Sequence, residues 1–249
     1  MQTEDKKKVY DLLLFNAAFL LIIWGMYYFD REFSWGLWRY GNHPREADGL
    51  IGVFSMPFLH GSYEHLRGNS MSFFVLSSFL IFFYREIAFR VLMWLYVGSG
   101  VLLWLWGGGG NHIGASGVIY GIASFIFVSG VVRRNPVLMR VSLAVAFLYG
   151  SMVWWVLPIE KHISWEGHLA GAVMGLILAL AYKNLGPQRK VYDWENEPDD
   201  FDVEFIEVTP HGEIVHGPSA EPSSPESNES AKPSEKGSTG GWTSSSTWQ

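Results

Sequence analysis

The sequence has 249 residues, of which 49% are hydrophobic and 16% aromatic, and it contains no cysteine. The lack of cysteine excludes a disulfide, a thiol nucleophile and a cysteine–zinc site. The formal net charge of −6 comes largely from the C-terminal tail, so it gives no argument for a nucleic-acid partner. Residues 1–185 have the apolar content of a polytopic membrane protein.

Six apolar segments are predicted to be transmembrane helices. They lie near residues 12–29, 69–84, 91–106, 116–132, 141–157 and 168–182. Each has about the length that a bilayer core requires, and only helices fit because lipid offers no hydrogen-bond partner to an open strand edge. The predicted fold class is therefore an all-α polytopic membrane protein with a bundle of six helices.

Basic residues predict how these helices are oriented. They precede the first span, separate spans two and three and spans four and five, and follow span six: Lys6, Lys7, Lys8, Arg85, Arg90, Arg133, Arg134, Arg140, Lys183, Arg189 and Lys190. With six spans, all of them fall on one side, which the positive-inside rule makes cytoplasmic. We therefore expect both termini in the cytoplasm and a location in the cell (inner) membrane.

Two segments differ from the spans. The segment 31–64 is too long for a simple connector, and its aromatic residues suit the headgroup layer, as an ordinary aromatic belt or as a functional loop. The tail at 186–249 is acidic and then rich in Ser, Pro and Gly, so it is expected to be mostly disordered and cytoplasmic. Within it, 203–208 alternates and 209–212 has turn residues, which permits a small hairpin. Residues 1–185 form the expected membrane domain.

The longest stretch without Asp, Glu, Lys or Arg runs from residue 91 to residue 132, about the length of two membrane crossings. Glycines at 107–110 interrupt it, and Gly114-Ala115-Ser116-Gly117 follows. A polar turn at the membrane boundary is expected there, with a new helix starting at Ser116. The first N–H groups of a helix have no intrahelical partner and stabilise negative charge. A serine nucleophile and an oxyanion site could be built together at this point.

Four polar side chains fall at the outer ends of predicted spans: Ser116, His168, His65 and Asn69. Polar residues at membrane depth are costly and often mark function. Neutral histidine is the usual base for a serine hydroxyl, and a helix N-terminus disfavours the imidazolium form of His168. No Asp or Glu lies within a span, so the pattern predicts a serine–histidine dyad rather than a triad.

A tetrahedral intermediate requires hydrogen-bond donors for its oxyanion. His65 and Asn69 are four residues apart, so they share one helical face and offer a ring N–H and an amide N–H. The backbone at Ser116, with Ala115 and Gly114 beside it, is expected to supply the remaining donors.

Each feature also has an ordinary explanation. A Gly-Ala-Ser-Gly run in a membrane helix is often a packing face, a histidine at a membrane boundary is often interfacial, and Asn69 could bond another helix. The run also differs from the hydrolase elbow, which requires glycine where Val118 stands. The joint occurrence of these residues on one side favours the catalytic interpretation.

A metal site is the strongest competing interpretation, because His60, His65 and His168 could be three ligands. No membrane carboxylate or thiolate joins them, and no His-Glu-x-x-His run occurs. His211 and His216 have the wrong spacing and lie in the tail. No metal is therefore predicted.

These motifs resemble those of the rhomboid intramembrane serine proteases. The resemblance covers about residues 10–185 and depends on four runs: Pro57-Phe58-Leu59-His60, His65-Leu66-Arg67-Gly68-Asn69, Gly114-Ala115-Ser116-Gly117 and Gly167-His168-Leu169-Ala170-Gly171. It implies a six-helix rhomboid-like bundle in which 31–64, with Pro44-Arg45, matches the family's first loop, which lies partly in the membrane. It also implies that Ser116 is the nucleophile, His168 its general base, and His65 and Asn69 oxyanion donors.

The resemblance implies supporting roles as well. His60 is expected near the active-site water, and Tyr120 is expected to pack against the catalytic histidine. Gly171 and Gly175 match small residues that let the sixth span approach the fourth.

The function implied by the resemblance is an intramembrane serine endopeptidase that needs no cofactor. Its expected partners are single-span membrane protein substrates and the lipid bilayer. An inactive rhomboid-like protein that binds membrane clients without cleaving them is the alternative. A transporter is disfavoured because no charged residue lies in the middle of a span to carry a coupling ion.

Overall fold

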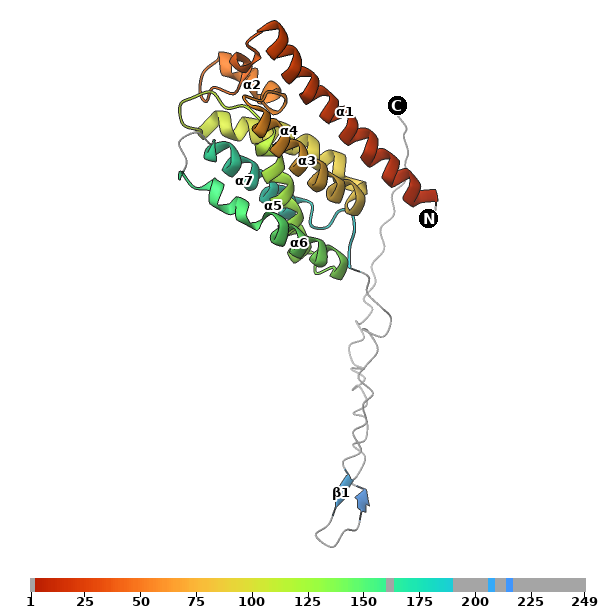
Figure 1. The fold of residues 1–249 in the computed structure, drawn as a ribbon. Coiled ribbons are helices and arrows are strands. Elements are labelled where there is room, and N and C mark those ends of the chain that lie inside the picture. The colour runs from red at the N-terminus through yellow and green to blue at the C-terminus, as the bar shows by residue number, and fades with distance from the viewer. Residues whose placement is uncertain (1–2, 160–163, 190–205, 209–213, 217–249) are drawn as a thin grey trace, which may run out of the picture. The chain divides into compact units, whose positions relative to one another are not determined.

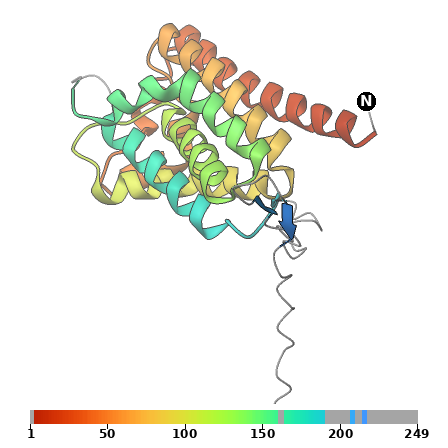
Figure 2. The ribbon, with the colours of Figure 1, turned by 90° about the horizontal axis from the view of Figure 1, so that it is seen from below.

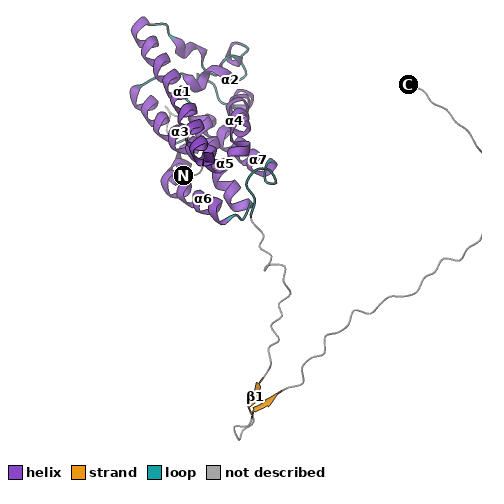
Figure 3. Ribbon diagram, turned by 90° about the vertical axis from the view of Figure 1, so that its right-hand side faces the viewer, coloured by secondary structure: helices purple, strands orange, loops and turns teal. Residues whose placement is uncertain are grey.

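The structure is a computed structural model that describes residues 3–159, 164–189, 206–208 and 214–216. The chain divides into two compact units, Met1–Tyr192 and Asp193–Gln249. The described part of the first unit is helical, and the strands among the described residues belong to the second (Figure 3). The predicted fold class, all-α with six long helices, is confirmed.

The six long helices follow the six predicted spans in order. They are α1 (Thr3–Phe33), α3 (Tyr63–Phe83), α4 (Arg85–Trp106), α5 (Ser116–Val132), α6 (Pro136–Tyr149) and α7 (Trp165–Ala181). The segment between α1 and α3 folds into short pieces: η1 (Leu37–Tyr40), η2 (Asp48–Leu50), α2 (Gly52–Ser55) and η3 (Met56–Phe58). The fifth span differs from the prediction, because α6 ends at Tyr149 and continues as the 3₁₀ helix η4 (Gly150–Val156).

Local capping sets where several helices begin. The hydroxyl of Ser62 accepts the N–H of His65 and starts α3. The side chain of Asn135 accepts two N–H groups at the start of α6, where Pro136 takes the first helical position. Such caps satisfy backbone donors that the helix leaves free, so the helices begin earlier than hydropathy alone predicts.

Four of the helical segments are long and apolar enough to cross a membrane: Val9–Phe33, Tyr63–Phe83, Arg85–Trp106 and Pro136–Val156. The two other long helices, α5 and α7, are apolar but have 17 residues each. At 1.5 Å per residue they are about 26 Å long, which is less than the roughly 30 Å of a bilayer core.

Helix α5 occupies the middle of the bundle, where it packs against α3, α4, α6 and α7 (Figures 1 and 2). Its side chains Ile122 and Phe125 are fully buried, as is Leu95 of α4. The outside of the bundle carries exposed apolar side chains, such as Phe147 of α6, which is 89% exposed. A central helix covered on all sides explains why α5 is apolar around its whole circumference.

Helix α1 lies along one edge of the bundle, beside α3 (Figure 1). The hydroxyl of Ser77 donates to Asn16 across 2.7 Å, and the indole N–H of Trp24 donates to Ser70 across 3.0 Å. These interhelical hydrogen bonds satisfy polar groups that would otherwise face lipid or apolar side chains.

Charged groups meet at the end of the bundle opposite the α5 N-terminus. Asp11 of α1 pairs with Arg85 at 2.8 Å. The buried guanidinium of Arg133 donates to the carbonyl oxygens of Tyr182 and Pro187, which ties the end of α5 to the end of α7. The basic residues Arg85 and Arg133 therefore share one end of the bundle, as six spans require.

The tail contains the hairpin that the alternating pattern permits. Strand β1 (Ile206–Val208) pairs antiparallel with β2 (Ile214–His216), and Glu207 lies opposite Val215. The disorder expected for most of 186–249 concerns residues that, apart from 186–189 and the two strands, lie outside the described ones.

Candidate active site

A cavity of about 910 Å³ opens at the N-terminal ends of α5 and α7. Three parts of the chain line it: the start of α3, residues 109–113 with Ser116 at the turn into α5, and Trp155 and Pro158 together with the first turn of α7. Its polar lining includes all four predicted catalytic and side-chain oxyanion residues: Ser116, His168, His65 and Asn69. The structure therefore brings together side chains from three helices that are far apart in the sequence.

Ser116 is the first residue of α5 and is half-buried at the cavity wall. Gly114, two residues earlier, has a φ of +111°, which L side chains rarely adopt. This backbone turn redirects the chain from the glycine-rich segment into α5. As the first helical residue, Ser116 has an N–H without an intrahelical acceptor.

His168 lies in the first turns of α7 and is buried. Its Nδ1 is 2.8 Å from the carbonyl oxygen of Trp155 in η4. A carbonyl only accepts, so Nδ1 carries the proton and Nε2 of the neutral ring has a free lone pair. The Trp155 carbonyl thus holds the His168 ring in one orientation and one tautomer, as a carboxylate holds the histidine of a triad.

The ring of Tyr120 stacks on the imidazole of His168, with ring centroids 4.1 Å apart and an interplanar angle of 9°. The Tyr120 hydroxyl donates to the carbonyl oxygen of Met152, 2.9 Å away. Both rings are therefore held by carbonyl groups of η4, one through Met152 and the other through Trp155.

Glycines let the two helices that carry Ser116 and His168 approach closely. A Cβ at Gly171 would overlap the carbonyl oxygen of Gly117, and one at Gly175 would overlap that of Gly121. At the cavity end, the Cβ position of Gly117 is 3.2 Å from the carbonyl oxygen of Gly167. Only helices without side chains at these positions can pack at this distance.

Among the hydrogen bonds of the described residues, none joins the Ser116 hydroxyl to His168. The two side chains line the same cavity, and Tyr120, one turn beyond Ser116, contacts His168 directly. Catalytic hydrogen bonds in unliganded enzymes are often long and shorten when substrate binds.

Asn69 and His65 form the wall of the cavity next to Gly114. The Cβ position of Gly114 is 2.5 Å from Nε2 of His65 and 3.2 Å from Nδ2 of Asn69, so both nitrogens converge there. Nδ2 of Asn69 is also 3.0 Å from Nε2 of His60. Since an amide nitrogen only donates, Nε2 of His60 is the acceptor, and the second N–H of Asn69 stays available.

His60 lies outside the transmembrane helices, between η3 and α3. Burial and, to a smaller extent, the nearby His65 lower its pKa to about 3, although a backbone interaction with Phe58 opposes the shift in part. A neutral ring is required for Nε2 to accept from Asn69, so the low pKa preserves this hydrogen bond at neutral pH.

One predicted donor is corrected by the structure. The N–H of Gly114 donates to the carbonyl oxygen of Met56 at 2.8 Å, so it has no hydrogen left for an oxyanion. Neither Gly114 nor the fully buried Ala115 is among the residues that line the cavity. Gly114 instead provides the space that His65 and Asn69 occupy.

Sequence reasoning missed three groups of this site. The carbonyl of Trp155 has no sequence signal, because every residue has a carbonyl. His112 and Ser164 both line the cavity, and Nδ1 of His112 is 2.6 Å from the Ser164 hydroxyl. His112 could have been identified from the sequence, because it is a histidine beside a glycine-rich turn at a membrane boundary.

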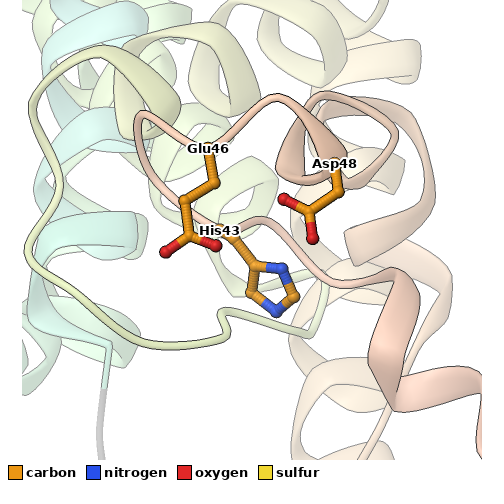
Figure 4. Close-up of side chains that lie close together, drawn as sticks. All are labelled: His43, Glu46 and Asp48. Atoms are coloured by element: carbon orange, nitrogen blue, oxygen red, sulfur yellow. The ribbon is translucent and has the colours of Figure 1, made fainter.

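A separate group of potential metal ligands lies on the loop after η1. His43, Glu46 and Asp48 have ligand atoms within 4.8 Å of one another (Figure 4). Both carboxylates are exposed, and exposed acidic groups often lie this close without an ion. The other candidate ligands are His60, His65 and His168. Among the described residues, the ring nitrogens of these three do not all lie within 4.8 Å of one another.

The chain is similar to a known protein family and to several mycobacterial proteins. The family model described as Rhomboid domain matches residues 47–184. Uncharacterized proteins of Mycobacterium tuberculosis and Mycobacterium bovis are each 34% identical over 160 residues, which cover 60% of this chain and 65% of the relative. An uncharacterized protein of Mycobacterium leprae is 33% identical over 156 residues, 58% of this chain and 60% of the relative.

The matched region thus covers less than two thirds of these relatives' length. The family match covers more than half of the chain and includes every helix that lines the cavity. On that evidence, this integral membrane protein belongs to the rhomboid family.

Proposed function

We propose that the protein is an intramembrane serine endopeptidase that cleaves transmembrane segments of single-span membrane proteins with a Ser116–His168 dyad. The observation that carries the proposal is the contact of His168 Nδ1 with the Trp155 carbonyl oxygen at 2.8 Å, in a ring that lines the same cavity as Ser116. A histidine held in this tautomer is ready to accept a proton at Nε2.

The proposed reaction uses groups of this chain and water. Nε2 of His168 takes the proton of the Ser116 hydroxyl as Oγ attacks the scissile carbonyl carbon. The resulting oxyanion accepts from the free N–H of Asn69, from His65 and from the Ser116 backbone, and each such donor contributes on the order of 100-fold or more in rate. His168 then gives the proton to the leaving amine, and water hydrolyses the acyl-enzyme with the same base.

The membrane setting is part of the proposal. A peptide bond in a helix is shielded by its own turn, so the substrate helix must unwind before Ser116 can attack. The cavity at the ends of two short helices would supply the water and the space for an unwound segment. We also propose that both termini are cytoplasmic, that the cavity faces the outer side, and that the protein resides in the cell membrane.

The test compares cleavage of a single-span reporter substrate in proteoliposomes by the wild type, Ser116→Ala and His168→Ala. Both variants are expected to lose at least about 1000-fold in kcat/KM, because neither nucleophile nor base has a substitute. Ser124→Ala is the matched control, since Ser124 also lies on α5 and donates to α7 through Ala172, away from the cavity.

A serine-reactive fluorophosphonate probe gives a second readout. It is expected to label the wild type and Ser124→Ala but not Ser116→Ala. Normal cleavage by Ser116→Ala would refute the proposal. A wild type that neither reacts with the probe nor cleaves any reporter would identify the protein as a rhomboid that binds clients without cleaving them.

A further inference from the structure

The cavity lining also includes a serine–histidine hydrogen bond that the proposed mechanism does not use. Nδ1 of His112 and Oγ of Ser164 are 2.6 Å apart. His112 precedes Ser116 by four residues, and Ser164 precedes His168 by four residues. The contact therefore joins the segment that leads to the nucleophile with the segment that leads to the base.

Ser164 is the N-cap of α7. Its hydroxyl oxygen accepts the N–H of Gly167 at 3.2 Å, and its carbonyl oxygen accepts the N–H of His168 at 3.2 Å. The cap uses one lone pair of the hydroxyl oxygen, and the hydroxyl proton remains available to donate to Nδ1 of His112. The first turn of α7, which carries His168, is thus fixed by a serine that His112 holds.

The tautomer of His112 follows from these contacts. If Nδ1 accepts, the ring proton lies on Nε2, which faces the carbonyl oxygen of Gly108 at 3.5 Å. Burial lowers the pKa of His112, and nearby His43 lowers it slightly, while Gly108 and Glu166 act in the opposite direction. The neutral ring that the contact with Ser164 requires is therefore the favoured form at neutral pH.

The backbone of His112 is anchored on the other side. Its N–H and carbonyl pair with the carbonyl and N–H of Asn42, both at 2.9 Å, in an isolated antiparallel bridge. Asn42 is fully buried, and its side chain donates to the carbonyl oxygen of Gly100 in α4 at 2.9 Å. A continuous set of hydrogen bonds therefore runs from α4 through Asn42 and His112 to Ser164 and α7.

We infer that His112 is a positioning residue, whose imidazole holds the start of α7 at a fixed distance from the start of α5 and thereby sets the distance between His168 and Ser116. This inference rests on the proposed function. His112 does not touch the reacting atoms, and it acts through Ser164. Misplacement of a catalytic pair by about 1 Å costs on the order of 100-fold in rate.

The experiment measures kcat and KM for reporter cleavage by His112→Ala, His112→Asn, Ser164→Ala and the double variant His112→Ala/Ser164→Ala. The Asn variant keeps an acceptor near the Nδ1 position, whereas Ala removes it. We expect His112→Ala to lower kcat by about 10- to 100-fold with KM nearly unchanged, and His112→Asn to recover most of the loss. In the Ser164→Ala background, His112→Ala is expected to cost little more, since the contact is already absent.

The matched control is Ser124→Ala. Ser124 also joins α5 to α7, through the carbonyl of Ala172, but it does not line the cavity, so its loss is expected to leave kcat at the wild-type value. The inference is wrong if His112→Ala keeps wild-type kcat, if Asn rescues no better than Ala, or if the two substitutions are additive. It is also wrong if the fluorophosphonate probe labels Ser116→Ala but not Ser164→Ala, because Ser164 would then be the nucleophile and His112 its base.

Amide hydrogen exchange of the peptide that contains Gly167 and His168 separates this inference from the proposed function. Faster exchange in His112→Ala is expected, because the cap of α7 loses its support. If the wild type is catalytically inert but exchange still rises in the variant, the contact stands and the protease proposal fails. If the wild type is active and neither kcat nor exchange changes, the protease proposal stands and the inference about His112 fails.

Discussion

At the scale of single residues, the site depends on hydrogen bonds that decide which nitrogen carries a proton. The carbonyl of Trp155 leaves Nε2 of His168 free, and the amide of Asn69 makes Nε2 of His60 an acceptor. Neither assignment follows from residue type, because a neutral imidazole exists in two tautomers. The chemistry proposed for His168 needs the tautomer that the Trp155 carbonyl selects.

The low pKa of His60 predicts a pH-dependent stability. Its pKa is about 3 in the folded protein and about 6.5 in the unfolded chain. The unfolded state therefore binds more protons between these values, so this contribution to stability is complete above pH 6.5 and is lost as the pH falls toward 3. One such group contributes up to about 1.4 kcal/mol per pH unit in this window.

The measurement is thermal unfolding in detergent at pH values from 7 to 4, for the wild type and His60→Gln. Glutamine keeps an acceptor for the Asn69 amide and does not titrate. The variant is expected to lose less stability than the wild type on acidification. Equal slopes for both proteins would contradict the role of His60 in this dependence.

At the scale of elements, the contact between α5 and α7 determines the site. Residues Gly117 and Gly121 of α5 face Gly171 and Gly175 of α7, and each pair brings backbone against backbone. The 3₁₀ helix η4 completes the arrangement, because its carbonyls hold Tyr120 and His168. Because η4 ends at Val156, the carbonyl of Trp155 lies in its last turn, where carbonyl groups lack intrahelical partners and can orient a side chain.

Gly171→Ala is expected to destabilise the protein by about 3 kcal/mol and to abolish cleavage, because its Cβ would overlap the backbone of α5 at Gly117. Gly25→Ala in α1 is the matched control, since nothing lies within 4 Å of its Cβ position. Alanine has the higher helix propensity, so the control is expected to be neutral or slightly stabilising. Unfolding in detergent and the cleavage assay measure both effects, and an active Gly171→Ala protein would show that the helices need not be this close.

At the scale of the whole molecule, the two ends of the bundle differ in chemistry. One end carries the cavity, and the other carries Asp11, Arg85 and Arg133 with the chain that follows α7. The central helices α5 and α7 are shorter than a bilayer core is thick. Their N-terminal ends, where the cavity opens, can therefore lie below the membrane surface.

The proposed orientation can be tested with single cysteines, because the chain has none of its own. Gly109 lines the cavity with nothing within 4 Å of its Cβ position, and Asn184 is exposed after the end of α7. In intact cells, a membrane-impermeant maleimide is expected to label Gly109→Cys and not Asn184→Cys. Labelling of Asn184→Cys alone would reverse the proposed orientation, and labelling of both would contradict an odd number of crossings between them.

The sequence by itself determined the helical class, the approximate place of six long helices and the family resemblance, because apolar runs, glycine breaks and short polar motifs are local properties. It also placed Ser116, His168, His65 and Asn69 at the same ends of their spans. The tertiary structure decided what depends on contacts between distant segments. The carbonyl of Met56 accepts the N–H of Gly114, the carbonyl of Trp155 orients His168, and His112 contacts Ser164 in the cavity lining. Such contacts join backbone groups and side chains whose neighbours are fixed only when the helices pack, so no local pattern encodes them.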